Sequence, residues 1–414
     1  MKIDRFINTD RMKLSFIIFR MLYFYLLIDM VNGVFLRMDF ISISIFYKTI
    51  ILSLVFVELR NQKYLYFPFI FLAIFFISHY MIVNDIWESI SGLNWLFKFY
   101  FIYWLYLFFK NQIEKGHFNE VVKVIQFCTF FVIVNTGLGI LGFGYAQYGE
   151  DIGVQGFIYA GNELAITIVC CFGFILMDCL VKNQYRNFLF FAILFLLIAL
   201  FSALKAAMFG AFLILLFFPV LKLFDKILSL KIHWKNALLS FFTIVMLPIA
   251  IFSGGYFVLF HLGLWNRISY FYYTRGLDVM SVILSNRNVW AKEAIEGSIE
   301  NYSFFEWLFG TSKEWLVHLN TPGKGSIEID LLDILLIYGF VGVFLTYGHF
   351  IRILFVNIKY RRLNPYSKYT GFLILLILLI SLTAGHVFYS GVGGPIISAV
   401  LAVTFYSIQN ENNI

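Results

Sequence analysis

Long apolar stretches alternate with short polar connections along almost the whole chain. Each stretch is close to the roughly 20 residues that an α-helix needs to cross the hydrocarbon core of a bilayer. The pattern predicts about twelve transmembrane helices, at residues 14–36, 40–57, 64–83, 90–109, 119–144, 158–181, 187–202, 205–221, 237–259, 327–350, 370–386 and 392–408. We therefore expect an all-α, polytopic integral membrane protein.

One substantial polar segment interrupts this pattern, from about residue 261 to residue 326. It contains several Arg and Trp residues and opens with Trp265 and Arg267. The chain is expected to consist of transmembrane helices 1–9 (residues 1–259), one large loop outside the lipid (260–326) and transmembrane helices 10–12 (327–414). Such a loop provides a place for chemistry at the membrane surface.

The composition also indicates a membrane protein: 61% of the residues are hydrophobic, 13% are charged, and the mean hydropathy is +0.83. These values exclude an ordinary soluble domain. All four cysteines, Cys128, Cys170, Cys171 and Cys179, fall within predicted spans. There they are expected to act as small hydrophobic side chains, and not as a disulfide framework or a metal site.

Basic residues concentrate in alternate connections, beginning with the N-terminal segment. The opposite connections carry acids, Asp85 and Glu88 in one and Glu150 and Asp151 in another. By the positive-inside rule, this asymmetry places both termini in the cytoplasm and the large loop on the opposite side of the membrane. The inside lysines and arginines account for the net charge of +7, which anionic lipid head groups can balance, so we expect no nucleic-acid partner.

The large loop contains similar numbers of acids and bases, so an anion site within it would depend on local arrangement. Arg267, Arg275 and Arg287 occupy its first part, where Asp278 is the only acid among them. Two interpretations stay open: the arginines bind an anionic substrate, or they pair with acids and loop carbonyls.

Ionisable residues inside predicted spans cost roughly 2.5–3.5 kcal/mol each at a helix centre, so each is a functional candidate. Lys205 lies between two closely joined apolar runs, which places it at a hairpin tip on the outer face. There it either contacts a phosphate at the interface or serves as an interfacial anchor. Lys48 and Lys98 are expected to snorkel or to form a salt bridge with Asp29.

The span after the large loop begins with three acids, Glu328, Asp330 and Asp333. Asp330 and Asp333 share one face of the predicted helix, and Glu328 precedes them in the first turn. The helix dipole favours acids in a first turn, so capping explains one of them. A carboxylate beside a substrate hydroxyl can also act as a general base. Further along, Gly339 and Gly342 permit close helix packing.

Several short motifs follow one another along the chain. They are Gly161-Asn162-Glu163-Leu164-Ala165 at the start of a span, the hairpin at 202–207, Arg287 followed by Trp290, Leu308-Phe309-Gly310, and the run from Glu328 to Gly342. In their order and topological placement they resemble the O-antigen polymerase and O-antigen ligase superfamily, the Wzy-type polysaccharide polymerases of bacterial inner membranes. In architecture the resemblance covers nearly the whole chain.

Two departures refine this resemblance. Ligases of the superfamily carry a histidine at a fixed spacing before a Gly-x-x-Gly, and Glu328 stands at that place here. The Glu328-x-Asp330-x-x-Asp333 pattern looks instead like capsular and O-antigen polymerases, so a polymerase is preferred. Lys205 stands where an arginine is common, which makes Arg287 the better candidate for phosphate binding.

The resemblance implies a GT-C-like membrane glycosyltransferase that needs no metal or cofactor. It would move a growing glycan from undecaprenyl diphosphate onto an incoming lipid-linked repeat unit of an O antigen or capsule, at the periplasmic face. Arg287 and Arg267 would bind the diphosphate, with Lys205 or Arg275 adding positive charge.

Glu328 or Asp330 would act as the general base in this scheme. Asp333, Asn162 and Glu163 would line the same substrate cavity. His318, His386 and Tyr302 are lesser candidates.

The partners implied are the lipid-linked oligosaccharide, membrane lipids, a chain-length regulator and a flippase. One alternative is an O-antigen ligase, which would attach finished chains to a lipid A core. The other is a polysaccharide flippase or transporter, with Asp29, Lys48 and Lys98 along a translocation path. The two halves of the chain show no clear internal repeat, which argues against a transporter.

Overall fold

The computed structural model describes residues 2–148, 152–158, 160–228, 281, 284, 286–311, 313 and 326–406. The predicted span at 237–259 and most of the large loop lie outside these residues. So do the candidates Arg267, Arg275 and His318.

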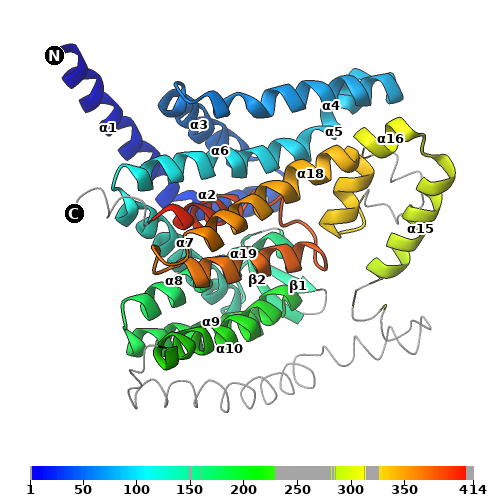
Figure 1. Cartoon of the computed structure of the whole chain (residues 1–414). Helices are drawn as coiled ribbons and strands as arrows, with labels where there is room; N and C mark the ends of the chain where they lie inside the picture. Colours follow the sequence, from blue (N-terminus) through cyan, green and yellow to red (C-terminus); the bar gives the residue numbers. More distant parts are fainter. Residues whose placement is uncertain are drawn as a thin grey trace.

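The described chain is nearly all-α, as expected (Figure 1). Its elements are α1 (Lys2–Tyr23), α2 (Tyr25–Arg37), α3 (Ile43–Leu59), η1 (Lys63–Leu65), α4 (Phe67–Val83), α5 (Ile86–Gly92), α6 (Asn94–Glu114), α7 (Phe118–Ile140), β1 (Tyr145–Tyr148), β2 (Ile152–Gly156), α8 (Gly161–Val181), α9 (Tyr185–Ser202), α10 (Lys205–Leu228), α15 (Arg287–Asn301), α16 (Phe304–Phe309), α18 (Asp330–Lys359), α19 (Ser367–Ser381), α20 (Gly394–Ala402) and η3 (Val403–Phe405). Each predicted span that falls on described residues coincides with one helix or with consecutive helices.

Six of the described helices are long and apolar enough to cross a membrane, or seven if the bent pair α1–α2 counts as one span. The two helices of that pair meet at 47°. Helix α19 and the combined α20–η3 segment are shorter apolar helices. These lengths and compositions are compatible with a multi-pass membrane protein.

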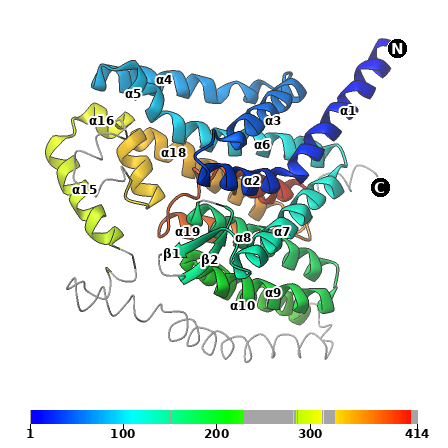
Figure 2. The ribbon, with the colours of Figure 1, turned by 180° about the vertical axis from the view of Figure 1, so that it is seen from behind.

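Helix α8 lies at the centre of the bundle, where it packs against α7, α9, α10, α19 and α20. In its most apolar 18-residue window, 94% of the residues are buried. Helix α20 fills the space between α8 and α6, where Ser398 donates a hydrogen bond to the carbonyl oxygen of Ile102 at 2.8 Å. In both views α4 lies at one edge of the bundle and α10 at the opposite edge (Figures 1 and 2).

The hairpin β1–β2 was not expected from the apolar pattern. Its strands pair antiparallel, and Asn135 of α7 ties the hairpin to the bundle: its side-chain NH2 donates to the Gln155 carbonyl at 2.8 Å. The Phe157 N–H donates in turn to Asn135 Oδ1, also at 2.8 Å. The hairpin between α7 and α8 therefore packs against the bundle through its described residues.

Helix α18 is broken at Gly339, whose backbone is far from helical (φ 63°, ψ −169°). This conformation is essentially restricted to glycine. The last turn of α16 packs against the break: a Cβ at Gly339 would lie 2.3 Å from the Leu308 carbonyl oxygen. Gly339 thus permits the close packing that its sequence position predicted.

The break frees backbone carbonyls that a continuous helix would pair internally. The Leu336 carbonyl accepts from the Thr311 N–H and from the Tyr302 hydroxyl, both at 3.1 Å. The Ile337 carbonyl lies 2.9 Å from Nε2 of His79, which donates when it carries the proton. Broken helices survive in a membrane only where such groups find partners within the protein.

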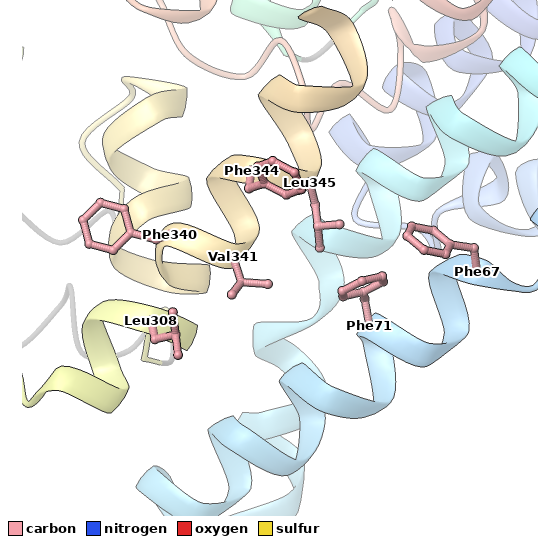
Figure 3. A pocket seen from close by; sticks show the side chains of 7 residues that line it. All are labelled: Phe67, Phe71, Leu308, Phe340, Val341, Phe344 and Leu345. Carbon is pink, nitrogen blue, oxygen red and sulfur yellow. The ribbon is translucent and has the colours of Figure 1, made fainter. Parts of the chain in front are cut away.

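An apolar groove of about 350 Å³ runs beside the second half of α18. Figure 3 shows its lining of side chains from α4, α16 and α18: Phe67, Phe71, Leu308, Phe340, Val341, Phe344 and Leu345. Phe344 is 77% exposed and Phe340 is 58% exposed. A surface of this kind is suited to acyl chains and offers no chemistry.

Replacing Gly339 with alanine should destabilise the protein, because the new Cβ meets the Leu308 carbonyl and the backbone conformation disfavours any side chain. We expect a loss of at least about 1–3 kcal/mol in the free energy of unfolding. Thermal unfolding of the detergent-solubilised protein measures it.

Gly348→Ala is the matched control, since Gly348 lies in the same helix and a Cβ added there would meet no neighbouring group within 4 Å. This substitution should leave the midpoint unchanged or raise it slightly. Equal midpoint shifts in the two variants would show that the break at Gly339 does not need a glycine.

Candidate functional site

A loop of residues 382–393 joins α19 to α20, and a buried carboxylate fastens it to the start of α18. Asp330 accepts hydrogen bonds from the N–H groups of His386 at 2.6 Å, Val387 at 2.9 Å and Phe388 at 3.1 Å. Its side chain is fully buried. Hydrogen bonds to a charged acceptor contribute about 1.5–3 kcal/mol each, so Asp330 fixes the path of this α19–α20 loop. Both of its oxygens are engaged, which favours a positioning role over that of a base.

Asp333 makes similar contacts to the chain just before α18. The Ile327 N–H donates to its Oδ1 at 2.7 Å, and the Glu328 N–H donates to its Oδ2 at 3.1 Å. Glu328 is held in a left-handed conformation (φ 62°), which is uncommon outside glycine. Gly385 packs against it so closely that a Cβ there would lie 2.4 Å from the Glu328 carbonyl oxygen. Asp333 and Gly385 together therefore set the position of Glu328.

Arg287, the first residue of α15, forms an ion pair with Glu328. Its Nη2 lies 2.7 Å from Oε2 of Glu328, and its Nη1 donates to the Thr383 carbonyl at 3.1 Å. The side chains are 13% and 19% exposed, respectively, so the pair is largely covered but still accessible. The buried Nε of Arg287 has no hydrogen-bond partner among the described residues. The bonds to Glu328 and Thr383 use two of the five N–H donors of the guanidinium.

Glu163 holds the other end of the α19–α20 loop. It accepts a hydrogen bond from the Val392 N–H at 2.8 Å and one from the Ser390 hydroxyl at 3.1 Å. The Tyr25 hydroxyl donates to the carbonyl oxygen of Gly391, between these two residues. Carboxylates on α8 and α18 therefore clamp one loop from two sides.

Lys48 forms the predicted salt bridge with Asp29, at 2.9 Å. A Cβ at Gly391 would lie 3.5 Å from Nζ of Lys48, so this pair sits beside the clamped loop. The lysine also lies over the ring of Tyr25, 5.1 Å from its centroid. These contacts give Lys48 and Asp29 a structural role at the edge of the site.

Aromatic residues border the loop on the side of α6. The ring of Trp95 lies 4.6 Å from that of Tyr389 and 6.2 Å from that of His386, between centroids. Nζ of Lys313 lies over the Trp95 ring, 5.3 Å from its centroid. Trp95 is only half-buried. The α19–α20 loop therefore lies between the Arg287–Glu328 ion pair and the aromatic ring of Trp95.

Burial lowers the pKa of His386 below its usual value, and the charges of Lys98 and Arg287 lower it further. Glu328 and Glu163 act in the opposite direction. The imidazole is consequently neutral at pH 7. These four charges all act on one ring, which indicates that they surround the same small region.

The structure brings five of the predicted site residues together. Arg287, Glu328, Asp330 and Glu163 contact the α19–α20 loop, and Asp333 holds the backbone of Glu328 beside it. The lesser candidate His386 belongs to the loop itself.

Two further candidates lie elsewhere on the helices. Lys205 is the exposed first residue of α10, at the predicted tip between α9 and α10, and Ala203 makes the turn (φ 52°). Asn162 is half-buried near the start of α8, one residue before Glu163.

Tyr302 helps to hold α15 and α16 against the break in α18. Its hydroxyl lies 2.8 Å from the Thr311 hydroxyl, and burial raises its pKa to about 12. Tyr302 is therefore neutral at physiological pH and supports the fold.

Sequence reasoning missed Trp95. Only the partial exposure of its ring beside a charged loop distinguishes this tryptophan from the other aromatic residues, and that exposure is visible only in the folded structure.

Within the described part of the chain, no group of three or more His, Cys, Asp or Glu side chains is arranged to hold a metal ion. Comparisons with protein-family models, with curated proteins and with solved structures found no match for this chain.

Replacing Asp330 with asparagine should loosen the α19–α20 loop, because the amide NH2 would face backbone donors in place of an acceptor oxygen. We expect amide hydrogen exchange at residues 386–388 to become about 10–100-fold faster. Hydrogen–deuterium exchange with mass spectrometry on the purified protein measures this.

Asp333→Asn is the matched control, since it should accelerate exchange at residues 327 and 328 instead. If both variants accelerated both segments equally, the two carboxylates would not have separate positioning roles.

Proposed function

We propose that this protein is a multi-pass glycosyltransferase of the bacterial inner membrane, with twelve spans, a GT-C-like fold and both termini in the cytoplasm. It polymerises the repeat units of a surface polysaccharide, an O antigen or a capsule, at the periplasmic face. The sequence resemblance supports this family, and the distribution of basic residues supports the orientation.

The observation that carries the proposal is the ion pair of Arg287 and Glu328. It joins the cation and the carboxylate that glycosyl transfer from a lipid diphosphate requires, and it is neither deeply buried nor fully exposed. Asp330, Asp333 and Glu163 hold the surrounding backbone in place. This preorganised backbone keeps Glu328 in position while Arg287 exchanges one anionic partner for another.

In the proposed reaction, the oxygen of an acceptor hydroxyl attacks the anomeric carbon that links the growing glycan to undecaprenyl diphosphate. The bond from this carbon to the diphosphate oxygen breaks, and its electron pair leaves with the diphosphate. The hydroxyl proton passes to the carboxylate of Glu328. Arg287 stabilises the negative charge of the leaving diphosphate by charge-assisted hydrogen bonds.

The ion pair also suggests how the two groups become active together. A bound diphosphate competes with Glu328 for the guanidinium, whose Nη1 and Nη2 each donate only one of their two N–H groups to Thr383 and Glu328. As Arg287 turns toward the diphosphate, Glu328 loses its cationic partner and becomes a stronger base. Substrate binding thereby activates the carboxylate.

Arg287→Ala should abolish polymerisation, because the leaving diphosphate loses its main cationic partner. We expect at least about a 100-fold loss of chains longer than one repeat unit, in line with the removal of a transition-state donor. Glu328→Gln should have a similar effect, since an amide cannot accept the proton. The glycan ladder of a host strain that lacks the gene, complemented with each variant, measures this.

Lys292→Ala is the matched control on α15, because this lysine is 74% exposed and, among the described residues, pairs only with the exposed Glu296, at 3.9 Å. Its ladder should equal that of the wild type at equal protein levels in the membrane. An unchanged ladder in the deletion strain would refute the polymerase assignment. Accumulation of long lipid-linked polymer would identify a ligase, and repeat units retained on the cytoplasmic leaflet would identify a flippase.

A further inference from the structure

We propose that Trp95, Lys98 and Lys313 form the acceptor-sugar subsite of this enzyme, and that the sugar bound there carries a negative charge. The inference rests on the proposed function and adds a substrate class to it: repeat units with an acidic sugar.

The aromatic part of the subsite is the ring of Trp95. It is half-buried beside the α19–α20 loop, and it contacts His386 and Tyr389 of that loop. Asp330 fixes the backbone of His386, and the same loop packs against Glu328. The same loop therefore fixes the position of the indole relative to the proposed base, Glu328. Its electron-rich face can receive the C–H groups of a sugar ring.

The charged part consists of two lysines. Nζ of Lys313 lies 5.3 Å from the centroid of the Trp95 ring. Lys98 follows Trp95 by one turn on α6, and its charge acts on His386. Neither lysine forms an ion pair with a described residue, whereas Arg287 pairs with Glu328 and Lys48 pairs with Asp29. Lys98 and Lys313 are therefore two cations near Trp95 that no described acid pairs with.

A negative group attached to a sugar ring fits this arrangement better than a lipid diphosphate. The diphosphate matches the planar, forked donors of Arg287, whereas lysines act as compact point charges. An aromatic face with such charges beside it matches an apolar ring face with an anion at its edge. On binding, the sugar takes the place of the Lys313 ammonium over the indole, and that ammonium pairs with the sugar carboxylate.

The test begins with the single repeat units that accumulate on lipid in a strain lacking the gene. Mild acid releases the glycan from its diphosphate, so any charge that remains belongs to the sugars. The released glycan should bind an anion-exchange column at pH 7. A neutral glycan, in a strain whose ladder requires the gene, would overturn the acidic subsite and leave the polymerase assignment intact.

The second arm complements the deletion with the double variant Lys98→Gln/Lys313→Gln. Since neither side chain pairs with a described acid, the protein should still reach the membrane at the wild-type level. We expect about a tenfold loss of long chains, the effect of one lost charge-assisted hydrogen bond. Lys292→Gln is the control for loss of a lysine charge and should leave the ladder unchanged.

Trp95→Phe and Trp95→Ala complete the series. The phenylalanine variant should produce more long chains in the glycan ladder than the alanine variant. A double lysine variant with a wild-type ladder would overturn the proposed subsite. A ladder that does not depend on the gene at all would refute the polymerase function, and the subsite with it.

Discussion

The candidate site depends on the capture of backbone N–H groups by buried carboxylates. Asp330 binds three consecutive N–H groups of the α19–α20 loop, and Glu163 binds a fourth further along. A loop at the edge of an apolar bundle cannot rely on water to satisfy its backbone, and each unsatisfied group is costly. The two carboxylates meet this need. They also fix the positions of the side chains that the loop carries, because the backbone between them has little freedom.

Helix α18 connects this site to the lipid-facing part of the molecule. Its first half carries Asp330 and Asp333, and its second half lines the apolar groove. The break at Gly339 lets these halves run in different directions without losing backbone hydrogen bonds, since Tyr302, Thr311 and His79 supply partners. A straight helix would not let α16 pack against it so closely. Gly339 thus fixes the end of the α15–α16 segment that lies opposite Arg287, while Glu328 and Thr383 hold Arg287 itself.

Much of the fold could be predicted from the sequence because the bilayer constrains it. Apolar runs of membrane-spanning length leave the backbone no regular alternative to a helix, so the described helices fall where the runs lie. The hairpin β1–β2 was not predicted, because two strands of four and five residues carry almost no periodic hydrophobic pattern. In the site, the acids and Arg287 stood out as polar residues in apolar surroundings. The hydrogen-bond partners of these residues could not be recognised in the sequence, because the N–H groups that Asp330 binds are 56 to 58 residues away along the chain. Trp95 was hidden among aromatics that make up 21% of the chain.

The partial exposure of the Arg287–Glu328 pair, 13% and 19%, is suited to an ion pair that must exchange partners. A fully exposed pair contributes little, typically about 0–1 kcal/mol, and would not hold either side chain in place. A fully buried pair would be hard to separate, because each charge would be left without compensation in a medium of low dielectric constant. Between these limits, the proposed reaction has a diphosphate replace the carboxylate as the partner of Arg287, one anion for another. In that scheme the guanidinium would stay compensated throughout, and the carboxylate would be released next to the acceptor.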